Sequence, residues 1–354
     1  MIFLRKLLRR PFFIRLFHWE FWPFLAVYAW VFPYWGWVAL RCRSLFFFNA
    51  VNPSIENGGL LNESKKDIHA ILPPDLYPRT EHFTADAGPD TVLARIEASR
   101  LRYPLIGKPD IGGKGRGIRK LHDKNELADY ARRAVMDFHI QEFVPYGKEV
   151  GIFYYRYPGE LRGKVSGIVR KEFLQVKGDG RRTIRELMQA DMRGIMYLEK
   201  VERSIGETLD SIPGSDSVVV VSPVGNHARG ALFLDESALA DEMLERRMDS
   251  IADRIPGFHF GRLDIRYRDW EAFKRGEDFV MIEVNGAGAE PTHMYDPSHS
   301  IFFAWKEIVR HWRIMGRISR INHRNGVPYL KFRQGVGVFR LERSISRSLE
   351  RMPE

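Results

Sequence analysis

The sequence is nearly free of cysteine, since Cys42 is the only one in 354 residues. A single thiol excludes an internal disulfide framework and a cysteine-ligated zinc site, and it is consistent with a reducing compartment. Internal repeats and low-complexity tracts are also absent. The length allows one large domain or roughly two or three small ones, with a sizeable hydrophobic core.

Charged side chains are absent from residues 21–40, although basic residues occur on both sides of this run. Five of the eight tryptophans fall between Trp19 and Trp37. An uncharged run of this length can cross a bilayer core of roughly 30 Å as a helix, but two prolines and a glycine interrupt it. The density of Trp and Tyr is typical of a membrane interface rather than of its hydrocarbon centre. No small-residue cleavage site follows, so we do not interpret the run as a secretory signal peptide.

We interpret residues 1–50 as a basic, aromatic segment that lies on the anionic inner, cytoplasmic face of a membrane. A single membrane span and an N-terminal helix packed on the protein's own core are the two alternatives. The net charge of +10 agrees with an anionic partner. Since no nucleic-acid-binding motif is present, we expect a nucleotide or a lipid surface and no nucleic acid. The oligomeric state is left open.

Two short segments in GRLDIRYRDWEAFKRGEDFVMIEVNGAGAEP predict antiparallel strands. Alternation within GRLDI places Arg262 and Asp264 on one face, and alternation within MIEVN places Glu283 and Asn285 on one face. If the strands pair, the three oxygen donors meet beside Arg262. Such a set suits Mg2+ that keeps some waters and takes its other ligands from phosphates. The alternative is an amphipathic hairpin with a solvated acidic face.

A glycine-rich loop, GGKGRG, follows a strand predicted at residues 103–108. The backbone N–H groups of such a loop can close over phosphates. Lys108 ends the strand just ahead of the loop and is placed to reach an α- or β-phosphate. A hairpin turn needs glycine too, so the loop alone is weak evidence. The candidate phosphate-binding residues of the loop are Gly112, Gly113, Lys114 and Gly115.

The strand predicted at residues 140–144 ends in a segment that can present one C=O and one N–H to an adenine edge. This segment contains Glu142, Phe143 and Val144. Glu149, on the next predicted strand, can accept hydrogen bonds from ribose hydroxyls. Taken alone, these are also ordinary strand residues with a charged face.

The rest of the pattern mixes helices and strands. Ser64 predicts the cap of a short helix, and Thr183 with Glu186 fits a capping box. A long helix is predicted at 237–255, with Leu239, Met243, Leu244 and Met248 in the core. Other helices are expected at 65–72, 90–100, 124–135, 183–190, 301–315 and 340–352, other strands at 148–156, 165–175, 217–222 and 327–332, and polar loops at 226–230 and 293–300.

Together these pieces resemble the ATP-grasp superfamily, most closely carboxylate–amine ligases of the D-alanine–D-alanine ligase type. The resemblance is carried, in order, by PLIGKP with GGKGRG, by QEFVPYGKEV, by GRLDI and by MIEVNGAG. KGDGRRTIREL is similar to a segment in the ATP-grasp parts of cyanophycin synthetases and bifunctional glutathione synthetases. The ordered set covers residues 64–310 and is specific, although each motif alone is not.

The resemblance implies a role for each motif. Lys108 would bind ATP phosphate under the glycine loop, Glu142 to Val144 would hold adenine, and Glu149 would hold ribose. Asp264, Glu283 and Asn285 would bind Mg2+ or Mn2+. The cationic residues implied are Lys65 or Lys66 on ATP, Arg262 on the transferred phosphoryl group, and Arg170 or Lys171 over the γ-phosphate.

The implied fold is α/β (α+β), with two ATP-grasp subdomains clasping ATP behind the N-terminal segment. The implied activity is ATP- and Mg2+-dependent ligation of a carboxylate to an amine or another nucleophile through an acyl phosphate. The alternative is an inactive ATP-binding regulatory or scaffold module at the membrane. The predicted divisions are 1–50 (membrane-associating), 51–83 (linker and short helix), 84–145 (lid), 146–315 (large subdomain with the metal site) and 316–354 (basic extension).

The turn after Asn285 differs from that of the D-alanine ligases, and residues 1–63 stand where such ligases carry an N-terminal α/β domain. The substrate is therefore left open. His293, His299 and the loop NHARG are candidates for the acceptor site, and solvated loop histidines are the alternative.

Overall fold

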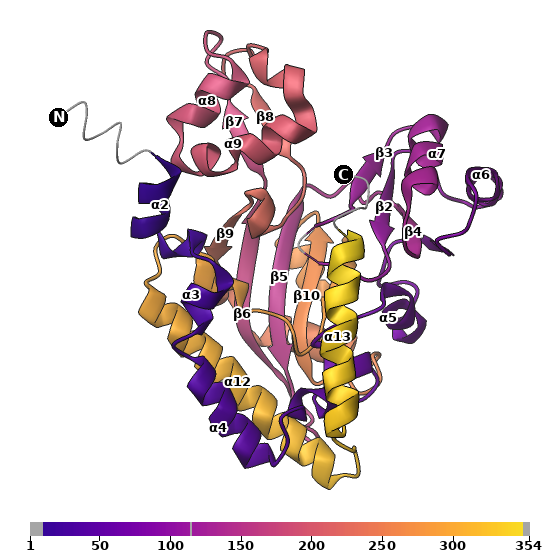
Figure 1. Ribbon diagram of the computed structural model, residues 1–354, viewed down its shortest axis with the longest axis vertical. Coiled ribbons are helices and arrows are strands. Elements are labelled where there is room, and N and C mark those ends of the chain that lie inside the picture. Colours follow the sequence, from indigo (N-terminus) through magenta and orange to yellow (C-terminus); the bar gives the residue numbers. More distant parts are fainter. Residues whose placement is uncertain (1–9, 114, 350–354) are drawn as a thin grey trace.

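The computed structural model describes residues 10–113 and 115–349. Helices and strands are mixed, and the strands form three sheets within this part of the chain (Figure 1). Lys114 and residues 1–9, which include part of the predicted membrane-associating segment, lie outside the described residues.

The N-terminal segment folds into short helices that pack on the body of the protein. The longest, α4, lies along helix α12 (Ile301–Arg324), and Val38 and Cys42 of α4 are buried against it. Within the described residues, no helix combines the length and apolarity needed to cross a membrane. The elements are α2 (Pro11–Phe17), η1 (Trp19–Phe21), α3 (Phe24–Tyr28), α4 (Phe32–Cys42), η2 (Phe47–Ala50), η3 (Glu56–Gly59) and α5 (Lys65–Ile71).

A lid of four strands and two helices stands beside the body (Figure 1). Its sheet has the order β1-β4-β2-β3, and α6 and α7 pack over a core that includes Leu105, Tyr130 and Phe138. Ser64 caps α5 as predicted, with its hydroxyl accepting from Asp67 N. The lid elements are β1 (Thr80–Phe83), α6 (Pro89–Ala98), β2 (Leu105–Pro109), β3 (Arg119–Leu121), α7 (Lys124–Arg133) and β4 (Phe138–Glu142).

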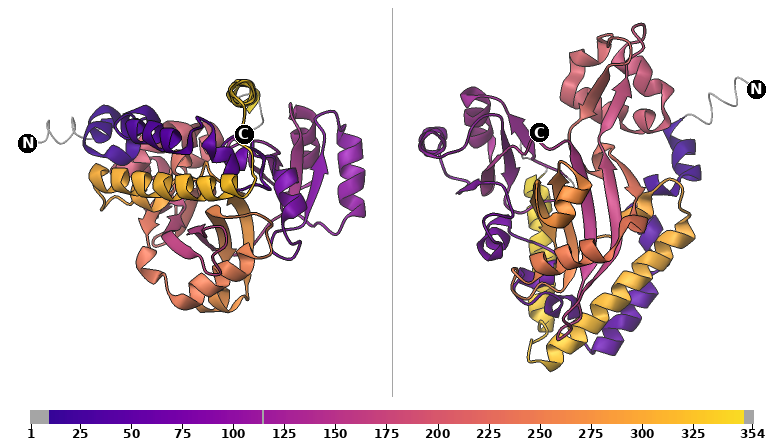
Figure 2. Two further views of the ribbon diagram at one scale, coloured as in Figure 1. Left: turned by 90° about the horizontal axis from the view of Figure 1, so that it is seen from below. Right: turned by 180° about the vertical axis from the view of Figure 1, so that it is seen from behind.

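The large subdomain is built on a sheet of order β11-β10-β5-β6-β9. Alternation sends Val150 and Ile152 of β5 into the core under α10 and α11, and Phe153 into the core under α12 and α4. These two layers of helices cover opposite faces of the sheet (Figure 2). The elements are β5 (Lys148–Tyr155), β6 (Lys164–Glu172), β9 (Leu232–Asp235), η6 (Ser237–Leu239), α10 (Glu242–Ala252), β10 (Phe260–Tyr267), α11 (Trp270–Arg275), β11 (Phe279–Asn285) and η7 (Thr292–Tyr295).

A small third unit follows β6, and the sequence prediction of one strand at 165–175 is wrong there. The chain leaves the large sheet at Phe173, and β7 pairs with β8 in a separate two-stranded sheet. Its core includes Met188 and Tyr197, and the predicted capping box of Thr183 and Glu186 is confirmed. The elements are β7 (Leu174–Lys177), α8 (Ile184–Ala190), α9 (Met192–Ile205), η4 (Gly206–Asp210), β8 (Val218–Ser222) and η5 (His227–Arg229).

The long helix predicted at 237–255 is also wrong at its start. Asp241 caps a shorter helix, α10, by accepting from Leu244 N, which leaves Leu239 and Met243 exposed while Leu244 and Met248 are fully buried. The predicted core positions are therefore correct for Leu244 and Met248 and wrong for Leu239 and Met243.

The strand predicted at 327–332 is wrong, because residues 327–331 form an irregular connection and Phe332 begins a helix. Helix α13 (Phe332–Leu349) stands upright between body and lid (Figure 1). Its first half packs on the body, where Gly335 lies against the ring of Phe46. Leu349, at its other end, is buried in the lid core and lies next to Gly112.

Candidate functional site

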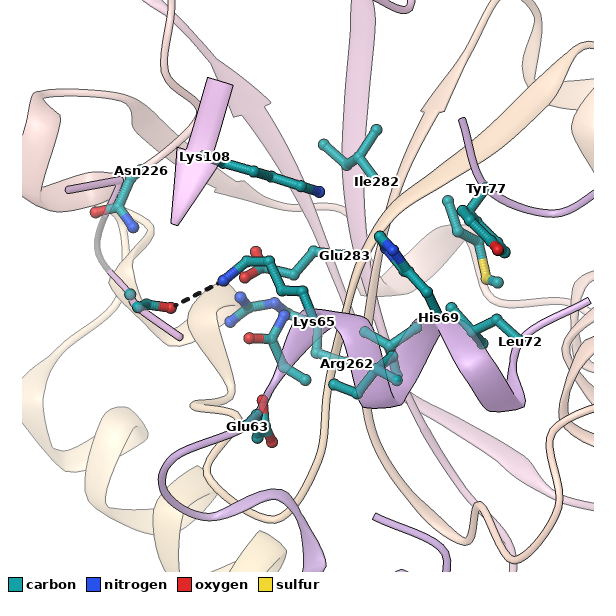
Figure 3. A pocket seen from close by; sticks show the side chains of 16 residues that line it. Glu63, Lys65, His69, Leu72, Tyr77, Lys108, Asn226, Arg262, Ile282 and Glu283 are labelled. Atoms are coloured by element: carbon teal, nitrogen blue, oxygen red, sulfur yellow. Dashed lines mark hydrogen bonds between the residues drawn. The ribbon is translucent and has the colours of Figure 1, made fainter. Parts of the chain in front are cut away.

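A cavity opens between the lid and the end of the β10–β11 hairpin (Figure 3). Cationic, acidic and apolar side chains contribute to its wall, and Figure 3 shows Lys65, Lys108 and Glu283 gathered in its polar half. The lining residues are Glu63, Lys65, Ile68, His69, Leu72, Tyr77, Lys108, Gly112, Gly113, Asn226, Arg262, Met281, Ile282, Glu283, Val284 and Asn285.

The predicted antiparallel pairing of the hairpin is confirmed. Asp264 of β10 lies opposite Glu283 of β11, and Arg262 lies opposite Asn285. Residues directly opposite each other share one face of a sheet, so the four side chains occupy one face. The connection is not a simple turn, because it contains helix α11.

Asp264 is buried and held by two cations. One of its oxygens accepts from Arg262 Nε at 2.8 Å, and the other accepts from Lys171 Nζ at 2.9 Å and Arg262 Nη2 at 3.2 Å. Burial alone would raise the pKa of Asp264, but the charges of Arg262 and Lys171 hold this pKa below its usual range. Asp264 is therefore an ionised carboxylate that fixes both cations beside the cavity.

Lys171 extends this buried network to a second carboxylate. Its Nζ lies 3.0 Å from Glu149 Oε1, while Glu149 Oε2 lies 3.2 Å from Arg266 Nε. Burial would lower the pKa of Lys171, but Asp264 and Glu149 raise it, so the amine is charged. Glu149, predicted to hold ribose, is engaged by these two cations in this structure.

The donor set at the hairpin fits a hard divalent cation. Glu283 and Asn285 line the cavity, and the side-chain carboxylate of Glu283 has no hydrogen-bond partner within residues 10–113 and 115–349. Asn285 Nδ2 is buried and also lacks one there. The described residues contain no group of three or more His, Cys, Asp or Glu side chains placed to hold a metal. The carboxylates of Asp264 and Glu283 and the amide of Asn285 suit Mg2+ that keeps several waters. Of these three side chains, Asp264 is already bonded to Arg262 and Lys171.

Two lysines face the hairpin across the cavity. Lys108 is buried on β2 and donates from Nζ to Gln141 Oε1 at 3.0 Å. Lys65 Nζ donates to Asp110 O at 3.1 Å and to Gly112 O at 3.4 Å. Of the two lysines that the sequence left as alternatives, Lys65 lines the cavity and Lys66 is exposed.

Lys108 provides a pH-dependent test of phosphate binding. Burial, together with the nearby charge of Lys65, lowers the pKa of Lys108 to about 7. A bound phosphate favours the charged amine and raises this pKa. We therefore expect ATP binding at pH 8 to take up a proton, and binding at pH 6 to take up much less because Lys108 is already charged. Affinity should fall as the pH rises through 7.

Titration calorimetry in two buffers with different ionisation enthalpies measures this uptake. The variant Lys108→Met should bind ATP more weakly and show no uptake that depends on this residue. Equal uptake by the variant and the wild-type protein would show that another group titrates.

The predicted adenine-binding segment lies outside the cavity lining. Glu142 forms an ion pair with Arg79 at 3.2 Å, and Val144 O accepts from Arg266 Nη1 at 3.1 Å. The ring of Phe143 lies under two cations, with Lys120 Nζ 4.2 Å from its centroid. The structure thus uses these residues to join the lid to the large sheet.

Some of the remaining predicted residues line the cavity, and others have partners elsewhere. Gly112 and Gly113 line the cavity, and Gly115 packs on Val224 with a positive φ. Arg170 points elsewhere and pairs with Glu236 at 2.6 Å and with Glu172. Lys114 lies outside the described residues.

The two loop histidines differ in exposure, since His293 is buried and His299 is half-buried, and both have carboxylate partners. His293 is buried, with Nε2 3.0 Å from Glu307 Oε2, and His299 Nε2 lies 2.8 Å from Asp235 Oδ2. From the loop NHARG, Asn226 reaches the cavity lining. His293 is buried because η7 packs on the sheet. The polar composition of the loop could not show this packing.

Sequence reasoning missed several lining residues. Glu63 Oε1 accepts from Gly286 N at 3.0 Å, and burial together with nearby Glu283 raises the pKa of Glu63 to about 8. His69 stacks on Tyr77 at 4.5 Å and belongs to an apolar end of the cavity with Met281. Burial and Lys108 lower the pKa of His69 to about 2, so its ring is neutral. No motif marks these positions, because they meet only through tertiary packing.

No family model matches the sequence, and a search of curated proteins finds no match. Solved structures that are similar include a D-alanine–D-alanine ligase from Bacillus anthracis, with 14% identity over 74% of this chain and 69% of that chain (TM-score 0.40). A D-Ala:D-Ser ligase from Enterococcus faecalis has 17% identity over 70% and 61% (TM-score 0.39). A bifunctional glutathione synthetase from Pasteurella multocida has 16% identity over 73% and 34% (TM-score 0.35).

The chain spans about a third of the glutathione synthetase and about three fifths of the D-Ala:D-Ser ligase. Because every TM-score is below 0.5, the activity has to be argued from this chain's own side chains.

Proposed function

We propose that the protein is an ATP- and Mg2+-dependent ligase that joins a carboxylate to an amine or another nucleophile. One observation carries the proposal. A single cavity brings Lys65, Lys108 and Arg262 against Glu283 and Asn285, so phosphate-binding cations face hard oxygen donors. This combination suits a nucleotide triphosphate held with a divalent cation.

In this proposal Lys65 and Lys108 bind phosphate oxygens, and the loop at Gly112 and Gly113 covers them. Asn285 and Glu283, with Asp264, would hold Mg2+, which supplies charge neutralisation at the transferred phosphoryl group. Arg262 and Lys171 are fixed by Asp264 and stabilise the charge that develops when the substrate carboxylate attacks the γ-phosphate.

The γ-phosphoryl group moves to the carboxylate oxygen and ADP leaves, which gives an acyl phosphate. The nucleophile then forms a bond to the acyl carbon and gives up a proton to solvent or to the departing phosphate, and inorganic phosphate leaves as the C–O bond breaks. Positioning and charge stabilisation suffice for both steps, so no side-chain nucleophile is required.

ADP and phosphate release by the purified protein tests the proposal. The protein is incubated with Mg-ATP and pooled amino acids, peptides, carboxylic acids or lipid extracts. Substrate-dependent release of both products supports a ligase. ATP binding without release in any pool would instead support an ATP-binding regulatory or scaffold module.

We also propose that the ligase works at the anionic inner face of a membrane. Glu20 is the only acidic residue between Arg10 and Ala50, and it is buried. The exposed surface of this segment is thus apolar and basic, with arginines at 10, 15, 41 and 43. Its most exposed apolar side chains include Phe12, Phe17, Leu25, Trp30, Trp37 and Leu40.

This composition complements a lipid surface. Aromatic rings and leucines insert into the interface, and arginines attract anionic headgroups. Leu40 and Trp30 are 78% and 74% exposed, so burying them in lipid would remove a large apolar area from water. The described helices pack on the body through other side chains, so these exposed residues remain available for contact with lipid.

Vesicle co-sedimentation measures this association. We expect binding to vesicles of phosphatidylcholine with phosphatidylglycerol, and weaker binding to phosphatidylcholine alone. Replacing Leu25, Trp30 and Leu40 together with Ser should weaken binding about tenfold or more. Leu161→Ser, at a 90% exposed position outside the segment, is the matched control. Equal binding by the triple variant and the control would contradict the proposal.

A further inference from the structure

The N-terminal segment also has an inward side, which reaches the residues next to the cavity. Tyr28 is 4% exposed, and its hydroxyl donates to Glu290 Oε1 at 2.7 Å. Trp19 Nε1 donates to His299 O at 2.7 Å. Glu20 pairs with Arg193 and lies 3.2 Å from His227. The segment therefore forms a wall beside the cavity as well as a surface.

Glu290 is the member of this wall that lies next to the proposed catalytic cation. Arg262 Nη1 donates to Glu290 O at 3.4 Å. Burial would lower the pKa of Arg262, but Asp264, Glu283 and Glu290 all raise it. The charge of Glu290 is thus felt at the arginine that lines the cavity.

Two phenols orient this carboxylate. Glu290 Oε1 accepts from Tyr28 and from Tyr295, the second at 3.3 Å. Burial and the charge of Glu290 raise the pKa of both phenols well above their ordinary value, so both remain protonated donors. No donor to Glu290 Oε2 occurs within the described residues, and this atom is not among the buried ones that lack a partner. One oxygen is fixed and the other can accept from a ligand.

The surroundings favour a cation at that oxygen. Tyr295 stacks on His227 with 5.0 Å between centroids and on Trp19 with 5.5 Å. These stacked rings hold Tyr295, and through it Glu290, in place, and a fixed carboxylate with one free oxygen attracts an ammonium group by charge pairing and hydrogen bonding. A substrate carboxylate would be repelled here and drawn to Arg262. Glu290 therefore attracts a cationic acceptor, and Arg262 attracts the carboxylate substrate.

We propose that Glu290, held by Tyr28 and Tyr295, binds a primary ammonium group of the acceptor substrate. The inference rests on the proposed ligase function and names the acceptor's chemistry as a cationic amine. The amine can belong to a free amino acid or to a lipid headgroup. Leu25, which is 69% exposed, and Tyr28, which is buried, both belong to α3, so one short helix carries a residue of the proposed lipid surface and a residue of this subsite.

The test uses the full chain with Mg-ATP and the carboxylate pool, and it varies the acceptor. The acceptors are pooled amino acids, vesicles containing phosphatidylethanolamine, and hydroxylamine, a small nucleophile that is uncharged at pH 7.5. The variants are Glu290→Gln and Tyr28→Phe, with Glu97→Gln on the exposed side of α6 as the matched control.

We expect Glu290→Gln to raise the KM for the ammonium-bearing acceptor at least tenfold. The KM for ATP and hydroxamate formation with hydroxylamine should stay within about twofold of the wild-type values. Tyr28→Phe should raise the acceptor KM only several-fold, because Tyr295 still donates a hydrogen bond to Glu290. The acceptor pool that supports turnover tells a free amine from a lipid-borne one.

An unchanged acceptor KM in Glu290→Gln would overturn the inference. So would an equal loss of hydroxamate formation and ATP binding, which would indicate a structural role. If the wild-type protein releases no ADP with any acceptor, the proposed function itself fails. That outcome is distinguishable, because the wild-type protein rather than the variant is then inactive.

Discussion

Glu283→Gln should lower substrate-dependent ADP release at least about a hundredfold, the loss expected when one group that stabilises transition-state charge is removed. Glu283 lines the cavity opposite Asp264. Its carboxylate forms no direct ion pair in the described part of the chain, whereas Asp264 is held by Arg262 and Lys171. Glu283 is therefore the carboxylate most available to Mg2+.

The measurement is ADP release as a function of Mg2+ concentration. The exposed Glu277, in the same hairpin, provides the matched control Glu277→Gln. We expect the Glu283 variant to need more Mg2+ even where some activity survives, and the control to behave as the wild-type protein does. Wild-type turnover and Mg2+ dependence in Glu283→Gln would remove the proposed metal site from the hairpin.

Lys171→Met should reduce the free energy of unfolding by about 3–5 kcal/mol, because it breaks a buried ion pair by removing one partner. Lys171 lies between Glu149 and Asp264, whose side chains are 4% and 3% exposed. Methionine has a similar length but no charge, so both carboxylates keep their burial and lose a cation. Arg262 and Arg266 then offset only part of the cost.

Urea unfolding at pH 7 measures this loss. Lys177→Met is the matched control, since Lys177 pairs with Asp216 on the surface and both side chains are more than two thirds exposed. An exposed pair contributes about 0–1 kcal/mol. A loss of less than 1 kcal/mol in Lys171→Met would mean that solvent reaches the network. Adding Glu149→Gln to Lys171→Met should recover part of the stability.

Local sequence patterns predicted the elements that depend on neighbouring residues. Alternation in GRLDI and MIEVN was enough to pair Asp264 with Glu283, because a strand's side chains have a period of two. The capping box at Thr183 is a contact over three residues and was equally readable. Lys108 was predicted at the end of a strand, and it lies near the end of β2 and lines the cavity.

The parts that were missed depend on contacts between distant residues. Tyr28 and Glu290 are 262 positions apart, and nothing near Tyr28 marks it as facing inward. The residue alternation at 165–175 could not show that the chain changes sheets at Phe173. Likewise, the basic composition after Arg317 gave no sign that helix α13 would find one partner surface at Phe46 and another in the lid.

The placement of α13 has a mechanical consequence. Near its beginning, the rings of Phe332 and Phe339 pack against Phe46 of the body, with ring centroids within 6.3 Å. At its other end, Leu349 is buried in the lid core beside Gly112. The helix thus links the body to the lid beside Gly112, which lines the cavity. Because α13 contacts both the body and the lid, any movement of the lid relative to the body requires this helix to pivot or to release one end.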